Sequence, residues 1–208
     1  MDDWKRCLGV FAAAVLLLAT PADARRVKRG GAKNPVRQAA CVAECDTVRN
    51  LIYMIGDGMG LAHVTMLQIA EGYDNPVSFM QAENVALIKS YSRNNRVTDS
   101  AAAGTALATG HKTNNSMLGV LPDSTAVESM MAKAVRRGMA TGLVVTCYLP
   151  HATPGAFYAH QVYRRTLEPI AEQLVESGVD VAFGGGKRYF TARRADGTTL
   201  VDRLRTKG

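Results

Sequence analysis

From Arg49 onward, short apolar runs alternate with longer segments whose apolar residues recur at helical spacing. The apolar runs lack the polar alternation of a half-exposed strand, which is typical of strands buried on both faces of a parallel sheet. They predict four strands, at residues 51–55, 85–88, 142–146 and 179–183. Alternation of such strands with amphipathic helices predicts an α/β fold, a three-layer sandwich around a mostly parallel central sheet.

Four helices are expected between these strands. One covers residues 61–70, and an alanine-rich run through Ala108 predicts another that begins at Ser100. Thr125 and Glu128 have capping-box spacing ahead of the third helix, which Gly138 ends. Its apolar face is Val127, Met130, Met131, Ala134 and Val135, and we read the two methionines as core residues. A fourth helix has Leu167, Ile170, Ala171, Leu174 and Val175 on one face and stops at Gly178. Residues 198–208 show no clear terminal element, and we expect a truncated chain.

The first 24 residues have the pattern of a secretory signal peptide. Lys5 and Arg6 precede an apolar run at residues 8–19, and small residues at Ala22 and Ala24 offer a cleavage site. The apolar run is too short to span a bilayer as a helix. We therefore expect cleavage after Ala24, export to the periplasm, cell surface or medium, and no transmembrane helix after cleavage. A signal anchor is the alternative.

The excess of positive charge is concentrated in the segment that follows. The chain has a net charge of +7, and residues 25–37 hold six basic side chains and no acidic one. Residues 25–48 are expected to form a solvated leader. The leader also holds Cys41 and Cys45, which could close a local disulfide in an exported protein, with Cys147 as a buried thiol. Sparse aromatic residues and the absence of a recognition motif argue against specific nucleic-acid binding.

The chemistry-bearing residues lie where predicted strands end or helices begin. Asp99 and Ser100 precede the alanine-rich helix, so they are either an ordinary N-cap or an anion site with a nucleophile. Asp57, between two glycines, follows the first predicted strand, and His151 and Thr153 follow the third. Because ligands gather at the carboxyl ends of parallel strands, these groups are expected at one edge. Carboxylate, imidazole and hydroxyl groups suit divalent cations.

Several ordered motifs resemble those of the alkaline phosphatases, from about Asn50 to Phe190. They are residues 50–60, 97–101, 109–115 (Thr-Gly-His-Lys-Thr-Asn-Asn), 151–154 (His-Ala-Thr-Pro) and 179–186. The resemblance implies that residues 49–208 are the N-terminal part of an alkaline phosphatase-like catalytic domain. It also implies a metal-dependent hydrolase that cleaves phosphate monoesters through a phosphoserine intermediate, and a homodimer is possible because family members commonly form one.

The resemblance also assigns roles to individual residues. Ser100 is the expected nucleophile and a zinc ligand, and Asp57 is the expected carboxylate shared between that zinc and a magnesium ion. His151 and Thr153 match magnesium-site positions. Arg164 aligns with the arginine that holds the substrate phosphate, and Asp99 is expected to orient it. The family uses two Zn²⁺ and one Mg²⁺, and its further Asp, Glu and His ligands come from segments absent here.

Other readings of the sequence remain open at this point. A sulfatase or phosphodiesterase of the wider metal-dependent superfamily is one, and an exported fragment that binds metal or anion without turnover is another. A serine hydrolase is disfavoured because the chain has no Gly-x-Ser-x-Gly motif. His63 and His160 fall in predicted helices and are expected to be structural, and His111 matches no ligand position. Gly184, Gly185 and Gly186 are read as a strand-end turn.

Overall fold

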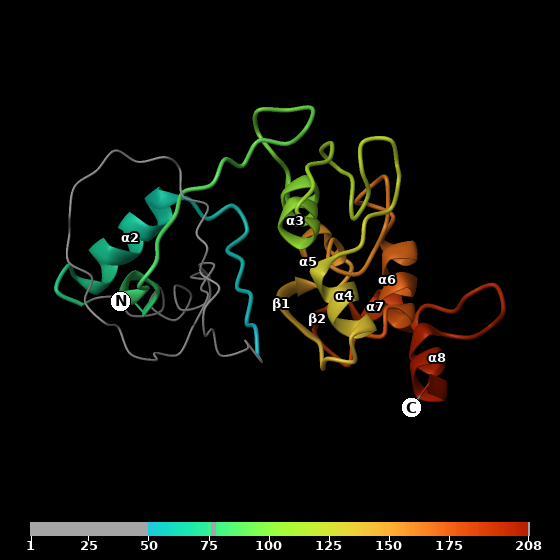
Figure 1. The fold of residues 1–208 in the computed structure, drawn as a ribbon. Coiled ribbons are helices and arrows are strands. Elements are labelled where there is room, and N and C mark those ends of the chain that lie inside the picture. The colour runs from blue at the N-terminus through green and yellow to red at the C-terminus, as the bar shows by residue number, and fades with distance from the viewer. Residues whose placement is uncertain (1–49, 76–77, 208) are drawn as a thin grey trace. The chain divides into compact units, whose positions relative to one another are not determined.

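A computed structural model describes residues 50–75 and 78–207 and divides the chain into two compact units, Met1–Ala86 and Leu87–Gly208. The expected signal peptide, the basic leader, and Cys41 with Cys45 lie outside the described residues. Figure 1 shows the chain coloured from its N-terminus to its C-terminus. No helix within the described ranges is long and apolar enough to cross a bilayer.

The first unit contains one long helix. Helix α2 (Leu61–Glu71) begins after Gly60, whose N–H donates to His63 Nδ1 at 3.2 Å, and a short 3₁₀ helix, η1, covers Ser78–Gln81. His63 lies within this helix, as predicted. The prediction of strands at residues 51–55 and 85–88 is wrong, since neither segment forms a strand with any described residue. A strand is stable only when a neighbouring strand pairs with its backbone, and apolar runs do not specify that neighbour.

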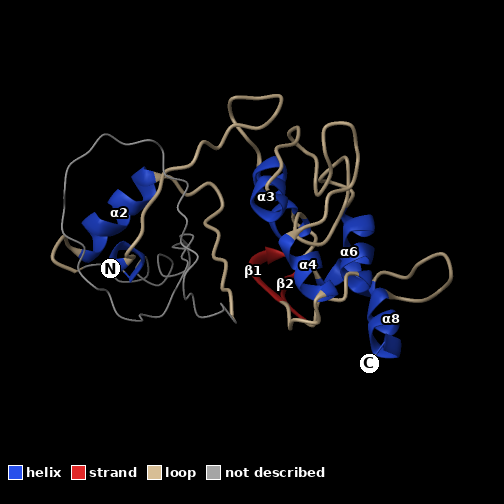
Figure 2. Ribbon diagram, viewed as in Figure 1, coloured by secondary structure: helices blue, strands red, loops and turns tan. Residues whose placement is uncertain are grey.

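The second unit carries a parallel sheet of two strands, β1 (Gly142–Tyr148) and β2 (Val181–Gly185). Figure 2 shows these strands among the helices. The helices are α3 (Ser100–Thr109), α4 (Met130–Arg136), α5 (Ala152–Gly155), α6 (Leu167–Glu176), α7 (Lys187–Thr191) and α8 (Leu200–Lys207). The α/β class and the parallel sheet are confirmed, and the described residues pair two of the four predicted strands.

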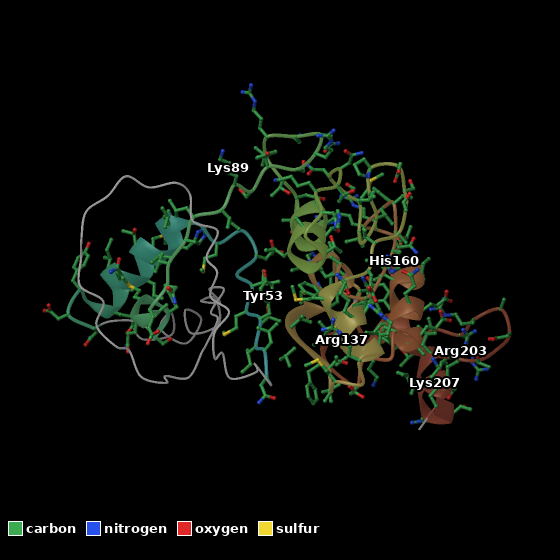
Figure 3. All side chains as sticks on the ribbon, viewed as in Figure 1. Tyr53, Lys89, Arg137, His160, Arg203 and Lys207 are labelled. Atoms are coloured by element: carbon green, nitrogen blue, oxygen red, sulfur yellow. The ribbon has the colours of Figure 1, made fainter. Side chains whose placement is uncertain are left out.

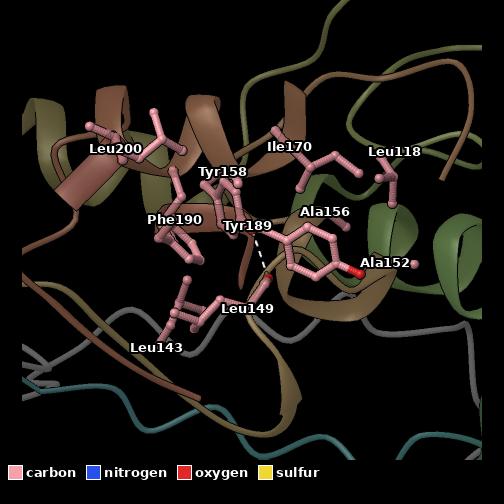
Figure 4. Close-up of a cluster of buried hydrophobic side chains, with 14 of the residues drawn as sticks. Leu118, Leu143, Leu149, Ala152, Ala156, Tyr158, Ile170, Tyr189, Phe190 and Leu200 are labelled. Atoms are coloured by element: carbon pink, nitrogen blue, oxygen red, sulfur yellow. Dashed lines mark hydrogen bonds between the residues drawn. The ribbon is translucent and has the colours of Figure 1, made fainter. Parts of the chain in front are cut away.

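The core of this unit lies between the sheet and the helices (Figure 4). Leu143 of β1 is buried there, whereas the next residue, Val144, is 80% exposed, so β1 has a covered side and an open one. Every residue of β2 is exposed. Helix α6 contributes Ile170, Ala171, Leu174 and Val175, as its periodicity predicted. Tyr158 donates its hydroxyl proton to Leu149 O at 2.7 Å, and burial raises the pKa of Tyr158 well above its usual range.

Helix α4 begins later than the predicted capping box. Its N-cap is Ser129, whose Oγ accepts the Ala132 N–H at 3.0 Å. Thr125 instead lies in a turn, where its carbonyl accepts the Leu121 N–H, and Glu128 pairs with Arg136 at 2.9 Å. Thr125 and Ser129 are both suitable N-cap residues, and Ser129 is the one used. The Val127 N–H donates to Gly119 O, which holds the backbone before Ser129 outside the helix. Met131 packs partly buried against the core.

The prediction that residues 198–208 form no element is also wrong. Thr199 Oγ1 accepts the Asp202 N–H at 3.1 Å, and Asp202 Oδ2 accepts the Thr199 N–H at 3.0 Å, which is a reciprocal cap at the start of α8. Leu200 is fully buried, and Lys207 donates to Val175 O at 2.8 Å (Figure 3). The cap, the buried Leu200 and the partly buried Val201 therefore dock this helix on the core.

The three glycines after the expected fourth strand serve backbone packing. Gly184 and Gly185 belong to β2 itself, and a Cβ at Gly184 would lie 2.6 Å from Val145 Cγ2. Gly186 has a φ of 93° and ends the strand ahead of α7. The reading of this segment as a strand-end turn holds for Gly186.

Candidate active site

Asp99 is the residue on which the candidate site converges. As the N-cap of α3 it has an extended backbone, and its Oδ1 accepts the Ala102 N–H at 2.9 Å. Its other oxygen, Oδ2, accepts the Ser116 N–H at 2.9 Å and pairs with Arg164 Nη1 at 3.1 Å. Both carboxylate oxygens therefore have charge-assisted partners, which fixes the side chain in one orientation.

Arg164 links Asp99 to His151. Its Nη2 lies 3.3 Å from His151 Nε2. Since a guanidinium group can only donate hydrogen bonds, this contact needs Nε2 as an acceptor, and the neutral imidazole then carries its proton on Nδ1. The side chains of Arg164 and Asp99 are each 23% exposed, so the ion pair is shielded from water but open on one side.

A cleft of about 450 Å³ opens beside this ion pair. Its lining residues are Asp99, Ser116, Tyr148, His151, Ala152, Tyr163, Arg164, Arg165 and Leu167. The ring of Tyr148 meets His151 edge-on, with 5.1 Å between the centroids. Two guanidinium groups in one cleft give it a positive wall suited to an anionic ligand.

Helices α3 and α5 pack closely and carry Ser100 and Thr153. Gly104 lies one turn after Ser100, and a Cβ there would be 3.1 Å from Ala156 Cβ and 3.4 Å from Thr153 O. Only a glycine permits this approach without a shift of α5. Ser100 is the first residue of α3, where backbone N–H groups and the helix dipole favour an anion.

These observations permit a comparison with known proteins. A sequence model of the family described as "Alkaline phosphatase" matches residues 48–208. The chain belongs to the alkaline phosphatase family.

Curated alkaline phosphatases agree with this membership. Alkaline phosphatase 4 of Bacillus subtilis is 37% identical over 159 residues, which cover 70% of this chain and 34% of that protein. The alkaline phosphatase of Escherichia coli is 33% identical over 191 residues, 77% of this chain and 41% of that protein. The chain thus spans about a third to two-fifths of the length of these relatives.

Solved structures give the same result. The alkaline phosphatase of the Antarctic bacterium TAB5 matches with a TM-score of 0.65 and 38% identity, over 73% of this chain and 43% of that one. A variant of the TAB5 enzyme with a histidine replaced by aspartate, solved with magnesium bound, matches with a TM-score of 0.62 and 37% identity over 69% of this chain and 41% of that one. The chain therefore shares its α/β fold with alkaline phosphatases of known structure.

The structure brings together only part of the site predicted for this chain. Asp99, His151 and Arg164 meet at the cleft, whereas Ser100 and Thr153, on the packed pair α3 and α5, do not line it. Asp57 belongs to the first unit and follows Gly56 in a turn. No cluster of three His, Cys, Asp or Glu side chains forms among the described residues.

Six residues that line the cleft were not predicted as site residues, and four of them carry polar groups: Ser116, Tyr148, Tyr163 and Arg165. The one available signal was proximity in sequence, since Tyr163 and Arg165 flank Arg164, and Ser116 follows the 109–115 motif. His160, expected in a helix, lies outside one, and its Nδ1 is 2.7 Å from Gly119 O (Figure 3).

Proposed function

We propose that the protein to which this chain belongs hydrolyses phosphate monoesters, with Ser100 as the nucleophile. The observation that supports this most is the ion pair of Asp99 and Arg164 directly at the N-terminus of α3, where Ser100 is the first helical residue. A guanidinium group and a helix N-terminus both bind phosphoryl oxygens. The reaction needs an ionised serine hydroxyl close to the phosphorus atom of a phosphate bound by these two groups.

The chain's own residues divide the reaction between them. Arg164, held by Asp99, donates two parallel hydrogen bonds to phosphoryl oxygens and neutralises part of their charge. The Ser100 oxygen attacks phosphorus and forms a phosphoserine while the ester oxygen leaves with the alcohol. Water then cleaves the Ser–O–P linkage, which returns Ser100 and releases inorganic phosphate. The N–H groups of the first turn of α3 stabilise negative charge in both steps.

The donor types in this chain fit divalent cations. The Ser100 hydroxyl, the His151 imidazole and the Thr153 hydroxyl of the second unit would hold Zn²⁺ and Mg²⁺, which suit such nitrogen and oxygen donors. Asp57, in the first unit, is proposed as a carboxylate ligand by likeness to the family alone. Bound metal supplies Lewis acidity that lowers the pKa of the serine hydroxyl. His151 Nε2 lies 3.3 Å from Arg164 Nη2, so His151 would serve as a cation ligand through Nε2 only where that atom does not accept from Arg164.

Two further properties belong to this proposal. The N-terminal 24 residues would direct export, and the mature protein would act on small phosphate esters outside the cytoplasm. A homodimer is proposed by likeness to the family. Binding of anion or metal without turnover is a second candidate, and the cleft lined by Arg164 and Arg165 favours the anion.

The decisive experiment is to follow phosphorus on Ser100 in the complete, metal-loaded protein. Ser100→Ala should lose phosphomonoesterase activity by several orders of magnitude and carry no covalent phosphate after an acid quench. Ser90 is an exposed serine of the same unit, so Ser90→Ala is the matched control. It should keep both the phosphomonoesterase activity and the covalent phosphate label. Equal label on wild type and Ser100→Ala would refute the nucleophile. Phosphate binding by calorimetry without any turnover in wild type would favour the binding candidate.

A further inference from the structure

The turn at Asn115 and Ser116 contacts both members of the candidate phosphate clamp, Asp99 and Arg164. Ser116 donates its N–H to Asp99 Oδ2 at 2.9 Å, and its carbonyl accepts the Arg164 N–H at 2.8 Å. One residue therefore bonds the acidic side chain and the backbone of the arginine, which are 65 residues apart in sequence. Nothing in the proposed chemistry requires Ser116 to touch the substrate.

Asn115 ties the same turn to the segment that leads into Ser100. Its Oδ1 accepts the Asp99 N–H at 3.2 Å, and its Nδ2 donates to Val97 O at 3.0 Å. The backbone N–H of Asn115 donates in turn to Asn94 Oδ1 at 2.9 Å. An amide side chain is suited to this position because it offers an acceptor and a donor together.

The backbone of Ser116 is itself held in an unfavourable conformation. Its φ is 74°, in the left-handed region that residues with a Cβ seldom adopt. Such conformations persist where surrounding bonds over-determine them, and they gather at functional sites. Ser124, with a φ of 71° in an exposed turn, is the only other described non-glycine residue with positive φ, and it lies outside the cleft.

We propose that Asn115 and Ser116 form a positioning element that sets the orientation of Asp99 and Arg164 for phosphate binding. The inference rests on the proposed function for its ligand but concerns residues to which that function assigns no role. Loss of the Asn115 amide would free the Asp99 backbone and the Val97 carbonyl, and the carboxylate would then hold Arg164 in several orientations. The expected consequence is weaker phosphate binding rather than loss of the nucleophile.

The test measures the dissociation constant of inorganic phosphate by calorimetry, with KM and kcat for a phosphomonoester, in the complete, metal-loaded protein. Asn115→Ala should raise the dissociation constant and KM by about tenfold, the equivalent of one hydrogen bond of about 1.4 kcal/mol, with a smaller change in kcat. Asn95→Ala is the matched control, since Asn95 Oδ1 accepts the Val97 N–H at 3.0 Å, whereas the Asp99 N–H bonds the side chain of Asn115. This control should leave phosphate affinity within about twofold of wild type.

A second pair of variants guards against simple misfolding. Ser116→Val and Ser124→Val both place a β-branched residue at positive φ, so both should lower the melting temperature. Only Ser116→Val should weaken phosphate binding. Equal phosphate affinity in wild type and Asn115→Ala, or equal losses in the two valine variants, would overturn the inference. If the wild-type protein binds phosphate but hydrolyses no ester, the proposed function is wrong. The phosphate affinities of the variants would still test the role of Asn115 and Ser116.

Discussion

At the scale of single residues, Asp99 combines a local structural task with a long-range one. Its Oδ1 caps α3, and its Oδ2 joins Ser116 and Arg164. Capping alone is served equally well by serine, threonine or asparagine. The need to hold a guanidinium group is what makes a carboxylate the suitable cap here.

Replacing Asp99 should therefore affect both stability and binding. Asp99→Ala removes the cap, which costs about 1–2 kcal/mol of unfolding free energy, and leaves Arg164 without its carboxylate. The dissociation constant for inorganic phosphate should rise as well. Ser129→Ala removes the cap of α4 and should lower stability without changing phosphate affinity. Denaturant unfolding and calorimetry on the two variants check this, and unchanged affinity in Asp99→Ala would contradict it.

The same residues show what a sequence can and cannot predict about the site. Asp99 and Ser100 were identified because capping signals and helix-forming runs are local in sequence. The hydrogen bonds of Asn115 and Ser116 to Asp99 span 16 and 17 residues, and the positive φ of Ser116 has no compositional signal, since serine rarely adopts it. Contacts of this kind depend on tertiary structure and were not predicted.

At the scale of elements, the close approach of α3 and α5 determines where Ser100 and Thr153 lie. The approach occurs at Gly104, where a Cβ would be 3.1 Å from Ala156 Cβ. A helix-interior glycine costs about 1 kcal/mol relative to alanine. This cost is offset by packing that a larger residue would prevent.

Enlarging Gly104 should separate the two helices. Gly104→Val should lower the unfolding free energy by about 1–3 kcal/mol through overpacking, and it should also lower kcat/KM because α5 carries Thr153. Ala103→Val, at a partly exposed position of α3, is the control and should have a smaller effect on both. Thermal unfolding and steady-state kinetics test the pair, and equal effects would show that α3 and α5 are not tightly coupled.

The loop between α7 and α8 makes an independent prediction about pH. Hydrogen bonds from Thr198 and Arg203 lower the pKa of Asp196 to about 2. A depressed pKa in the folded state stabilises the fold above the ordinary pKa of 3.8, and the contribution is lost as the pH falls through about 2. A carboxyl NMR titration should find this low value, and Thr198→Val should raise it. A normal pKa in wild type would contradict the contacts.

Periodicity predicted the elements unevenly. Helix α6 was predicted because its apolar residues recur at helical spacing, and strand β1 because it is a short continuous apolar run. The start of α4 was wrong because two caps compete, and α8 was missed because one reciprocal cap and Leu200 stabilise it without a long apolar face. The strands expected at residues 51–55 and 85–88 depended on partners that apolar composition cannot specify.

At the scale of the whole molecule, the second unit has a two-stranded sheet with one open face, and only β1 has a side that faces the core. Val144 and Phe183 are paired across β1 and β2 and are 80% and 65% exposed, whereas Leu143 faces the core. Exposed apolar side chains that lie side by side favour association or binding of apolar dyes. This open face is a property of the residues that the structure describes.

Polar replacement of this pair should therefore change association without changing stability. The double variant Val144→Thr with Phe183→Thr should bind less of the dye ANS and scatter less light at high concentration, with the unfolding free energy within about 0.5 kcal/mol of wild type. Threonine retains strand propensity, so the sheet itself should persist. Val162→Thr, at an exposed residue outside both strands, controls for loss of any surface valine and should leave dye binding nearly unchanged. If the open face is instead covered in solution, Val144 and Phe183 are buried there. The double variant would then lower the unfolding free energy by several kcal/mol, because buried apolar groups would be lost.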